Sequence, residues 1–316
     1  MDLICWCGSR YWQAMVRCLG VTLLGLAVGT PALNAAEVRK PDPDEPAKDY
    51  VLWYRNYDSP PVIALVRLAL DETPEYGPYT ISRSVVMGQG RAVRELSESH
   101  RDFVTIANVA TSLDRERDLM AIPIPIDGGL LGFRVCVIKK ANQAKFRGIQ
   151  SLDDLTRRGI RIGQGRHWPD TSILRANGVE VIANTRFETL FRMLENDRFD
   201  CFARGVNEVL FDLDDIKDSN LMIEPNLLIA YPMPSYFFVA PDDQETAMRI
   251  QLGMERAIRD GRFARYLKRF YLVAVNSLNL EHRTVLVLNN PLLSDESRDI
   301  GRKALSTLKQ RINGVR

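Results

Sequence analysis

A cationic and aromatic tripeptide, Arg166-His167-Trp168, follows a short apolar run that ends in glycine. Residues 160–165 are typical of a buried strand with a glycine turn, and residues 170–178 are typical of a capped helix that stops at a glycine. Backbone N–H groups and the positive dipole end at the start of such a helix favour an anion. The pattern therefore predicts an anion-binding turn, although a surface turn with a solvated arginine fits the same residues.

The charge balance of the chain limits the classes of partner. The sequence has 316 residues, with 42 Lys or Arg against 40 Asp or Glu and a formal net charge of +2. This length fits one large domain or two medium ones. No basic run stands out, and nucleic acid is therefore not an expected partner.

No pattern typical of an enzyme, a metal site or a cofactor site stands out. His100, His167 and His282 lie far apart in the sequence and lack metal-ligand spacing. Residues 88–90 (GQG) lack the third glycine of a dinucleotide fingerprint, and no G-x-S-x-G motif occurs. We therefore expect no metal, no cofactor and no catalytic residues.

Residues 1–36 are typical of a secretory signal peptide. Arg17 precedes the apolar run 19–28, and small residues lead to Ala35 and Ala36, after either of which we expect cleavage. The apolar run is too short for a membrane anchor. The sequence thus predicts an exported, soluble protein with no membrane span after signal cleavage.

Two further features near the N-terminus are the start of translation and a linker. Met15 begins a tidier signal than Met1 does, so the start of translation is open between these two residues. Residues 37–48 are rich in proline and charge, and we interpret them as a linker.

Cysteine usage bears on the compartment. Cys5, Cys7 and Cys18 would leave with the signal, so that only Cys136 and Cys201 remain. In an oxidising compartment these two could pair. Each lies singly in an apolar, strand-like run, however, and this favours two buried free thiols.

The rest of the chain alternates strand-like runs with amphipathic helical segments in two α/β units. We assign residues 49–128 and 236–280 to lobe 1 and residues 129–235 to lobe 2. Residues 281–316 form a C-terminal extension that we expect to pack on lobe 1. Two crossings between the lobes would leave a ligand cleft between them.

Four loops follow predicted strands, where ligands bind in α/β sheets. They are residues 56–57, 108–112, 164–170 and 203–205. Their content of Arg, Trp, Tyr, His and Asn favours a polar, partly aromatic binding site.

Several motifs occur in a defined order along residues 48–275. They are TSLDRE at 111–116, LDDL at 152–155 with IRIGQG at 160–165, LENDRFD at 194–200 and RDGRFARYLKRFY at 259–271. Together they resemble the extracellular (periplasmic) solute-binding proteins of family 3, which bind polar amino acids. The phrase WPDTSILRANG at 168–178 resembles an uncharacterised subgroup of transporter substrate-binding-domain proteins. The chain departs from the family pattern by an extra residue before Arg115 and by Asn-Asp at 196–197 in place of glycine.

The resemblance implies a two-lobed α/β fold of the periplasmic-binding-protein type II class, with the ligand cleft between the lobes. It implies a monomer without enzyme activity that delivers a small molecule to the inner-membrane permease of an ABC-type importer. The alternative is a ligand sensor or partner subunit for a membrane signalling receptor. Some proteins of this fold resemble dehydratases, and in that reading His167 and Glu208 would be the acid and base.

The resemblance also suggests what the ligand meets. Arg115 matches the arginine that holds the ligand carboxylate, unless it only pins its own turn to an adjacent loop. The acid that holds the amino group is absent after Asp200, where Arg204 stands and the next acid is Glu208. An ammonium group without a carboxylate partner is costly to desolvate. We therefore expect a small anionic ligand, with amino acids still open if Glu208 reaches the amine.

In this hypothesis Arg115, Arg166 and Arg204 supply positive charge, while Tyr57 and Trp168 form apolar walls. The full set of candidate ligand-binding residues is Tyr57, Asn108, Thr111, Arg115, Arg166, His167, Trp168, Arg204 and Glu208.

Overall fold

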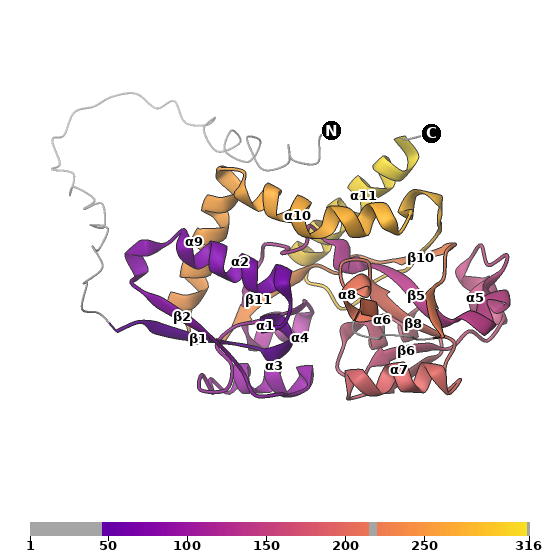
Figure 1. Ribbon diagram of the computed structural model, residues 1–316, viewed down its shortest axis with the longest axis horizontal. Helices are drawn as coiled ribbons and strands as arrows, with labels where there is room; N and C mark the ends of the chain where they lie inside the picture. Colours follow the sequence, from indigo (N-terminus) through magenta and orange to yellow (C-terminus); the bar gives the residue numbers. More distant parts are fainter. Residues whose placement is uncertain (1–45, 215–219, 315–316) are drawn as a thin grey trace, which may run out of the picture.

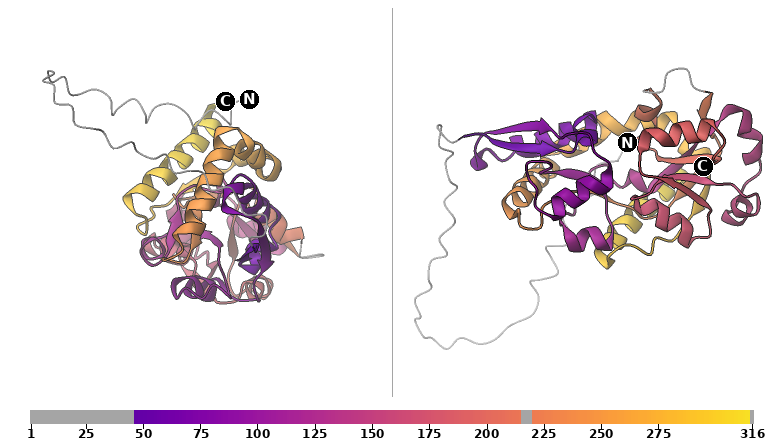
Figure 2. Two further views of the ribbon diagram at one scale, coloured as in Figure 1. Left: turned by 90° about the vertical axis from the view of Figure 1, so that its left-hand side faces the viewer. Right: turned by 90° about the horizontal axis from the view of Figure 1, so that it is seen from below.

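The strands gather in two lobes that lie side by side along the long axis of the molecule (Figure 1), also when the molecule is seen from below (Figure 2). The computed structural model describes residues 46–214 and 220–314, so the expected signal peptide and most of the linker lie outside the described residues. Among the described residues, none of the helices has the length and hydropathy that a bilayer span requires.

Lobe 1 is built on five strands. Strand β1 (Lys48–Leu52) pairs in parallel with β2 (Tyr79–Arg83), and a bridge from Leu52 to Ile106 joins this pair to a second sheet. The second sheet has the order β3 (Ala107–Ala110), β11 (Ser235–Val239), β4 (Met120–Ile122), and its neighbours are antiparallel. The lobe also holds α1 (Tyr54–Tyr57), η1 (Pro74–Tyr76), α3 (Gln89–Ser97) and α4 (Leu113–Asp118).

Two helices of lobe 1 pack tightly on each other, namely α2 (Pro60–Asp71) and α9 (Gln244–Arg259). Proline opens α2, as predicted, because its missing N–H has no partner in the first turn of a helix. The helices approach so closely that a side chain on Gly253 would collide with the carbonyl of Ala69. This contact anchors α9 to the lobe.

Lobe 2 contains a seven-stranded mixed sheet in the order β12, β10, β5, β8, β6, β7, with β9 beside β5. The strands are β5 (Phe133–Lys139), β6 (Ile162–Gly165), β7 (Val181–Asn184), β8 (Cys201–Gly205), β9 (Leu221–Ile223), β10 (Leu227–Ala230) and β12 (Thr284–Val287). The helices are η2 (Leu130–Gly132), η3 (Lys140–Phe146), α5 (Leu152–Arg157), α6 (Pro169–Ala176), α7 (Phe187–Glu195) and α8 (Val209–Asp214). Apolar clusters cover both faces of this sheet.

Cys136 and Cys201 form a disulfide, so the prediction of free thiols is wrong. Cys136 lies on β5 and Cys201 on β8, and these strands are direct antiparallel neighbours. Strand pairing brings Cys136 opposite Ala203, two residues from Cys201 on the same face. The single apolar runs in the sequence could not reveal this register.

The C-terminal extension differs from the expectation that it packs on lobe 1. Helix α10 (Arg262–Ser277) runs across the two lobes (Figure 1), and its Tyr266 belongs to the lobe 1 core whereas Leu278 belongs to the lobe 2 core. After η4 (Leu280–His282), strand β12 pairs in parallel with β10 and so completes the lobe 2 sheet. Only then does α11 (Asp295–Gly314) return to lobe 1, where the Ser297 hydroxyl donates to Glu116 at 2.6 Å. The extension therefore contacts both lobes.

Candidate functional site: the cleft between the lobes

A cavity of about 1420 Å³ lies between the lobes. Lobe 1 contributes α1, the loop before α3 and the end of β3, and lobe 2 contributes the ends of β6 and β8 and the starts of α6, α7 and α8. The volume exceeds the roughly 300–1,000 Å³ of most small-ligand sites. Both lobes direct loops that follow strands into this space, as predicted from the strand order.

Five of the nine candidate residues line this cavity. They are Asn108 from lobe 1, and His167, Trp168, Arg204 and Glu208 from lobe 2. The Asn108 amide donates to the Ser235 hydroxyl at 2.7 Å and to the Tyr236 carbonyl at 2.9 Å, and its backbone carbonyl accepts from Asn56. Lobe 1 thus lines the cleft with amide and hydroxyl groups rather than with charge at this point.

Four candidates are not among the residues that line the cavity. Tyr57 packs against the lobe 1 core, the buried Thr111 donates its hydroxyl to Glu116, and Arg166 is exposed on its turn. Arg115 is buried, and its guanidinium binds protein oxygens.

The Arg115 guanidinium links the two lobes. Nη1 donates to the Ala110 carbonyl at 2.5 Å, and Nη2 donates to Gln89 Oε1 at 2.7 Å and to the His167 carbonyl at 2.9 Å. Burial lowers the pKa of Arg115 to about 10, although the charge of Asp170 raises it in part. These contacts match the alternative in which Arg115 pins its turn to adjacent loops.

Sequence reasoning missed an ion pair at the floor of the cleft. Arg134 on β5 lies 2.8 Å from Asp170 at the start of α6, and both side chains are almost fully buried. The Tyr231 hydroxyl donates to the same carboxylate. Burial lowers the pKa of Arg134, but the neighbouring Asp170 and Tyr231 raise it by a larger amount, so the pKa ends above its ordinary value and the guanidinium stays charged. The sequence feature that could have pointed to this pair is an arginine inside the apolar run 130–138.

This ion pair also bears on the prediction that the turn before α6 binds an anion. Helix α6 begins at Pro169, and no side chain caps it. Asp170 lies in its first turn, so the chain's own carboxylate already occupies the positive end of the helix dipole. The Thr171 hydroxyl donates to the Gly165 carbonyl at 2.9 Å instead of capping the helix. The turn is therefore not a free site for an external anion.

Arg204 faces the cleft, but two carboxylates bind it. Its Nε donates to Asp212 at 2.6 Å, and its Nη2 lies 3.1 Å from Glu208. The guanidinium also lies 5.0 Å from the ring centroids of Trp168 and Phe187. The expectation that Arg204 offers unpaired positive charge is thus not met, because a helical turn beyond β8 returns two acids to it.

The two acids respond differently to this environment. Burial raises the pKa of Glu208, but Arg204 and Arg134 lower it more, and the pKa ends below its ordinary value. Burial also raises the pKa of Asp212, and here Arg204 offsets the rise only in part. The side chain of Glu208 is 38% exposed, so one edge of an ionised carboxylate remains open to the cleft.

The lobes touch at the mouth of the cleft. Arg55 of α1 lies with its guanidinium carbon 3.7 Å from the centroid of the Phe187 ring in lobe 2. A side chain on Gly90 would collide with the ring of His167, so that only glycine permits this approach. The structure therefore represents a form in which the lobes meet across the cleft.

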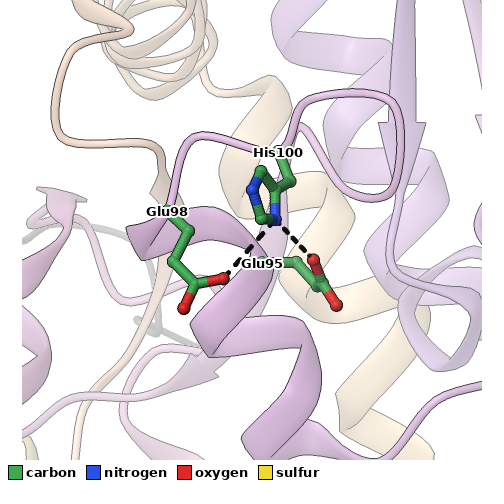
Figure 3. Close-up of side chains that lie close together, drawn as sticks. All are labelled: Glu95, Glu98 and His100. Carbon is green, nitrogen blue, oxygen red and sulfur yellow. Dashed lines mark hydrogen bonds and ion pairs between the residues drawn. The ribbon is translucent and has the colours of Figure 1, made fainter.

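One further cluster with metal-ligating side chains lies in the described part of the chain, outside the cleft (Figure 3). Glu95 and Glu98 of lobe 1 both contact the same nitrogen of His100, at 2.8 and 3.5 Å. Glu95 also accepts from Arg91 at 3.0 Å. Because these groups already satisfy one another, we assign no metal to the cluster.

No protein-family model matches this chain, and no curated protein matches it. Solved structures do. An ancestral arginine-binding protein bound to glutamine is 16% identical with a TM-score of 0.55, and the match covers 72% of this chain and 99% of that chain. The GluR0 ligand-binding core in complex with L-glutamate is 11% identical with a TM-score of 0.54, again over 72% and 99%.

A third structure is an amino acid ABC transporter substrate-binding protein from Streptococcus pneumoniae bound to L-arginine. It is 12% identical with a TM-score of 0.50, over 67% of this chain and 84% of that chain. This chain has the two-lobed periplasmic-binding-protein fold. The predicted fold class is thus confirmed, and the matched structures are binding proteins of the kind that the motifs resemble. More than a quarter of the chain lies outside the first two matches.

Proposed function

We propose that this protein is a periplasmic solute-binding protein that captures a small polar ligand between its lobes and delivers it to an ABC-type importer. The observation that carries the proposal is a cavity shared by both lobes, with buried arginine–carboxylate pairs in its wall. The fold supports it, because a protein with the same fold is described as an ABC transporter substrate-binding protein. In such folds two lobes hinge around the ligand.

The contacts change the expected class of ligand. The sequence favoured an anion, but Arg134 and Arg204 already have carboxylate partners. A purely anionic ligand would compete with these partners and would also meet the open edge of Glu208. A ligand that also carries an ammonium group lessens this conflict, since the ammonium group can bind the open edge of Glu208. We therefore favour a small zwitterion such as an amino acid.

A thermal-shift screen tests the proposal. The protein beginning at Glu37 is screened against amino acids, di- and tricarboxylates and aromatic acids, with hits measured by calorimetry. A ligand at 100 times its Kd should stabilise the protein by about 2.7 kcal/mol. Failure of every compound to shift the melting temperature would refute a solute-binding role. A shift with anions alone would refute the zwitterion.

A matched pair of variants tests the role of Glu208. Glu208→Gln should weaken binding of the ammonium ligand at least about tenfold, because a charge-assisted bond contributes on the order of 1.5–3 kcal/mol. Glu195→Gln removes an acid that lines the same cavity but contacts neither arginine pair, and it should leave binding unchanged. Equal losses in the two variants would point to bulk charge instead of a specific contact.

A further inference from the structure

One arginine reaches across the cleft from lobe 1 into a polar and aromatic corner of lobe 2. Arg55 lies on the one-turn helix α1, and its guanidinium carbon stands 3.7 Å from the centroid of the Phe187 ring. Its Nη2 lies 3.9 Å from Asp212 and its Nη1 lies 4.0 Å from Glu188. An aromatic face with two carboxylates is the chemistry that recognises a guanidinium group.

Lobe 2 holds this corner in place without help from Arg55. The Phe187 ring lies 5.3 Å from Phe191, 5.9 Å from Phe202 and 6.2 Å from Trp168, measured between ring centroids. The Asp212 carboxylate is fixed through Oδ2 by Arg204, which leaves Oδ1 toward Arg55. The corner is therefore preformed by the packing of one lobe, as a binding subsite is.

Arg55 itself is held only loosely by lobe 2. Its distances of 3.9 and 4.0 Å from the carboxylates exceed those of hydrogen bonds, and its side chain is 28% exposed. The contact with Phe187 is the closest one that it makes to lobe 2. A free guanidinium compound could take the same place with better geometry, since it is not tethered to the opposite lobe.

We propose that Phe187, Asp212 and Glu188 form a guanidinium-binding subsite on lobe 2, and that Arg55 is its internal occupant. By filling the subsite, Arg55 excludes ligands with a cationic side chain from this part of the cleft and thereby sets specificity. This inference rests on the proposed function, in which the cleft receives the ligand.

Calorimetry with agmatine and L-arginine as probes tests the inference on Arg55→Ala. Arg91→Ala is the matched control, because Arg91 also lines the cavity from lobe 1 but pairs with Glu95 of its own helix. Arg55→Ala should bind agmatine at least about tenfold more tightly than the wild type, as expected for a desolvated guanidinium on an aromatic face. Arg91→Ala should not gain affinity.

A second change locates the gain. In the Arg55→Ala background, Phe187→Leu should abolish most of the gained affinity, because it removes the aromatic face but keeps an apolar side chain. If Arg55→Ala does not fold, Arg55→Met keeps the apolar stem and is measured in its place. An equal gain in Arg91→Ala, or no gain in either Arg55 variant, would overturn the inference.

The outcome is separable from that of the solute screen. If the wild type binds a compound from the screen but the Arg55 variants gain no affinity for agmatine, the subsite is wrong and the solute-binding role stands. If the wild type binds nothing and Arg55→Ala binds agmatine, the subsite stands and the solute-binding role falls.

Discussion

Removing the Cys136–Cys201 disulfide should lower the free energy of unfolding substantially. The bond closes a loop with a sequence separation of 65 between two strands that are already paired in the folded sheet. Its main effect is therefore to restrict the unfolded chain, and the chain-entropy relation gives about 4 kcal/mol for a loop of this length. The double variant Cys136→Ala/Cys201→Ala should lose about this amount.

The measurement is equilibrium unfolding in urea at neutral pH, followed by tryptophan fluorescence, with and without a thiol reductant. The reductant should destabilise the wild type by a similar amount and should have no effect on the double variant. A loss below about 1 kcal/mol would refute the entropic reasoning. Two titratable thiols in the unreduced, denatured protein that begins at Glu37, which has only Cys136 and Cys201, would refute the disulfide itself.

Two further predictions concern buried charge. Asp170→Asn should lower the free energy of unfolding by about 3–5 kcal/mol because it leaves Arg134 buried without its nearest counter-charge, whereas exposed Asp153→Asn should have little effect in the same urea assay. Burial raises the pKa of Asp127 to about 6, against about 3.9 in the unfolded chain, so the folded protein binds this proton more tightly. The stabilisation that results from proton binding is complete below pH 4 and is lost as the pH rises through 6. Relative to Asp127→Asn, the wild type should therefore lose about 3 kcal/mol between pH 4 and pH 7, and parallel pH profiles of the two proteins would contradict this.

Local pattern was enough to predict most of the fold. The prolines that open α2 and Gly261, which separates α9 from α10, mark helix boundaries through backbone restrictions that act within a few residues. Apolar periodicity in the same way located the helix α7. The strand β6 was predicted too early, because it runs through Gly163 and Gly165, which were expected to form a turn. The two-lobed fold follows from the order of such elements.

The candidate site was predicted less completely. Loops at strand ends placed Trp168 and Arg204 in the wall of the cleft, because the carboxyl ends of parallel strands share one edge. Glu208, which lies beyond these loops, lines the same cavity. The partners of these residues were not predicted. Asp212 returns to Arg204 only because α8 folds back after β8, and the sequence showed no helical periodicity strong enough to predict that turn.

By itself, the sequence determined the order of strands and helices, the two α/β units and the supply of charged and aromatic side chains at the strand ends. Propensity and periodicity are local, and they act wherever the chain later goes. Only the tertiary structure decided which charges pair, that Cys136 and Cys201 join, and that Arg55 meets Phe187 across the cleft. Each of these contacts depends on strand register or on how the lobes meet. The spacing of residues along the chain specifies neither of them, because both arise from contacts between segments far apart in the sequence.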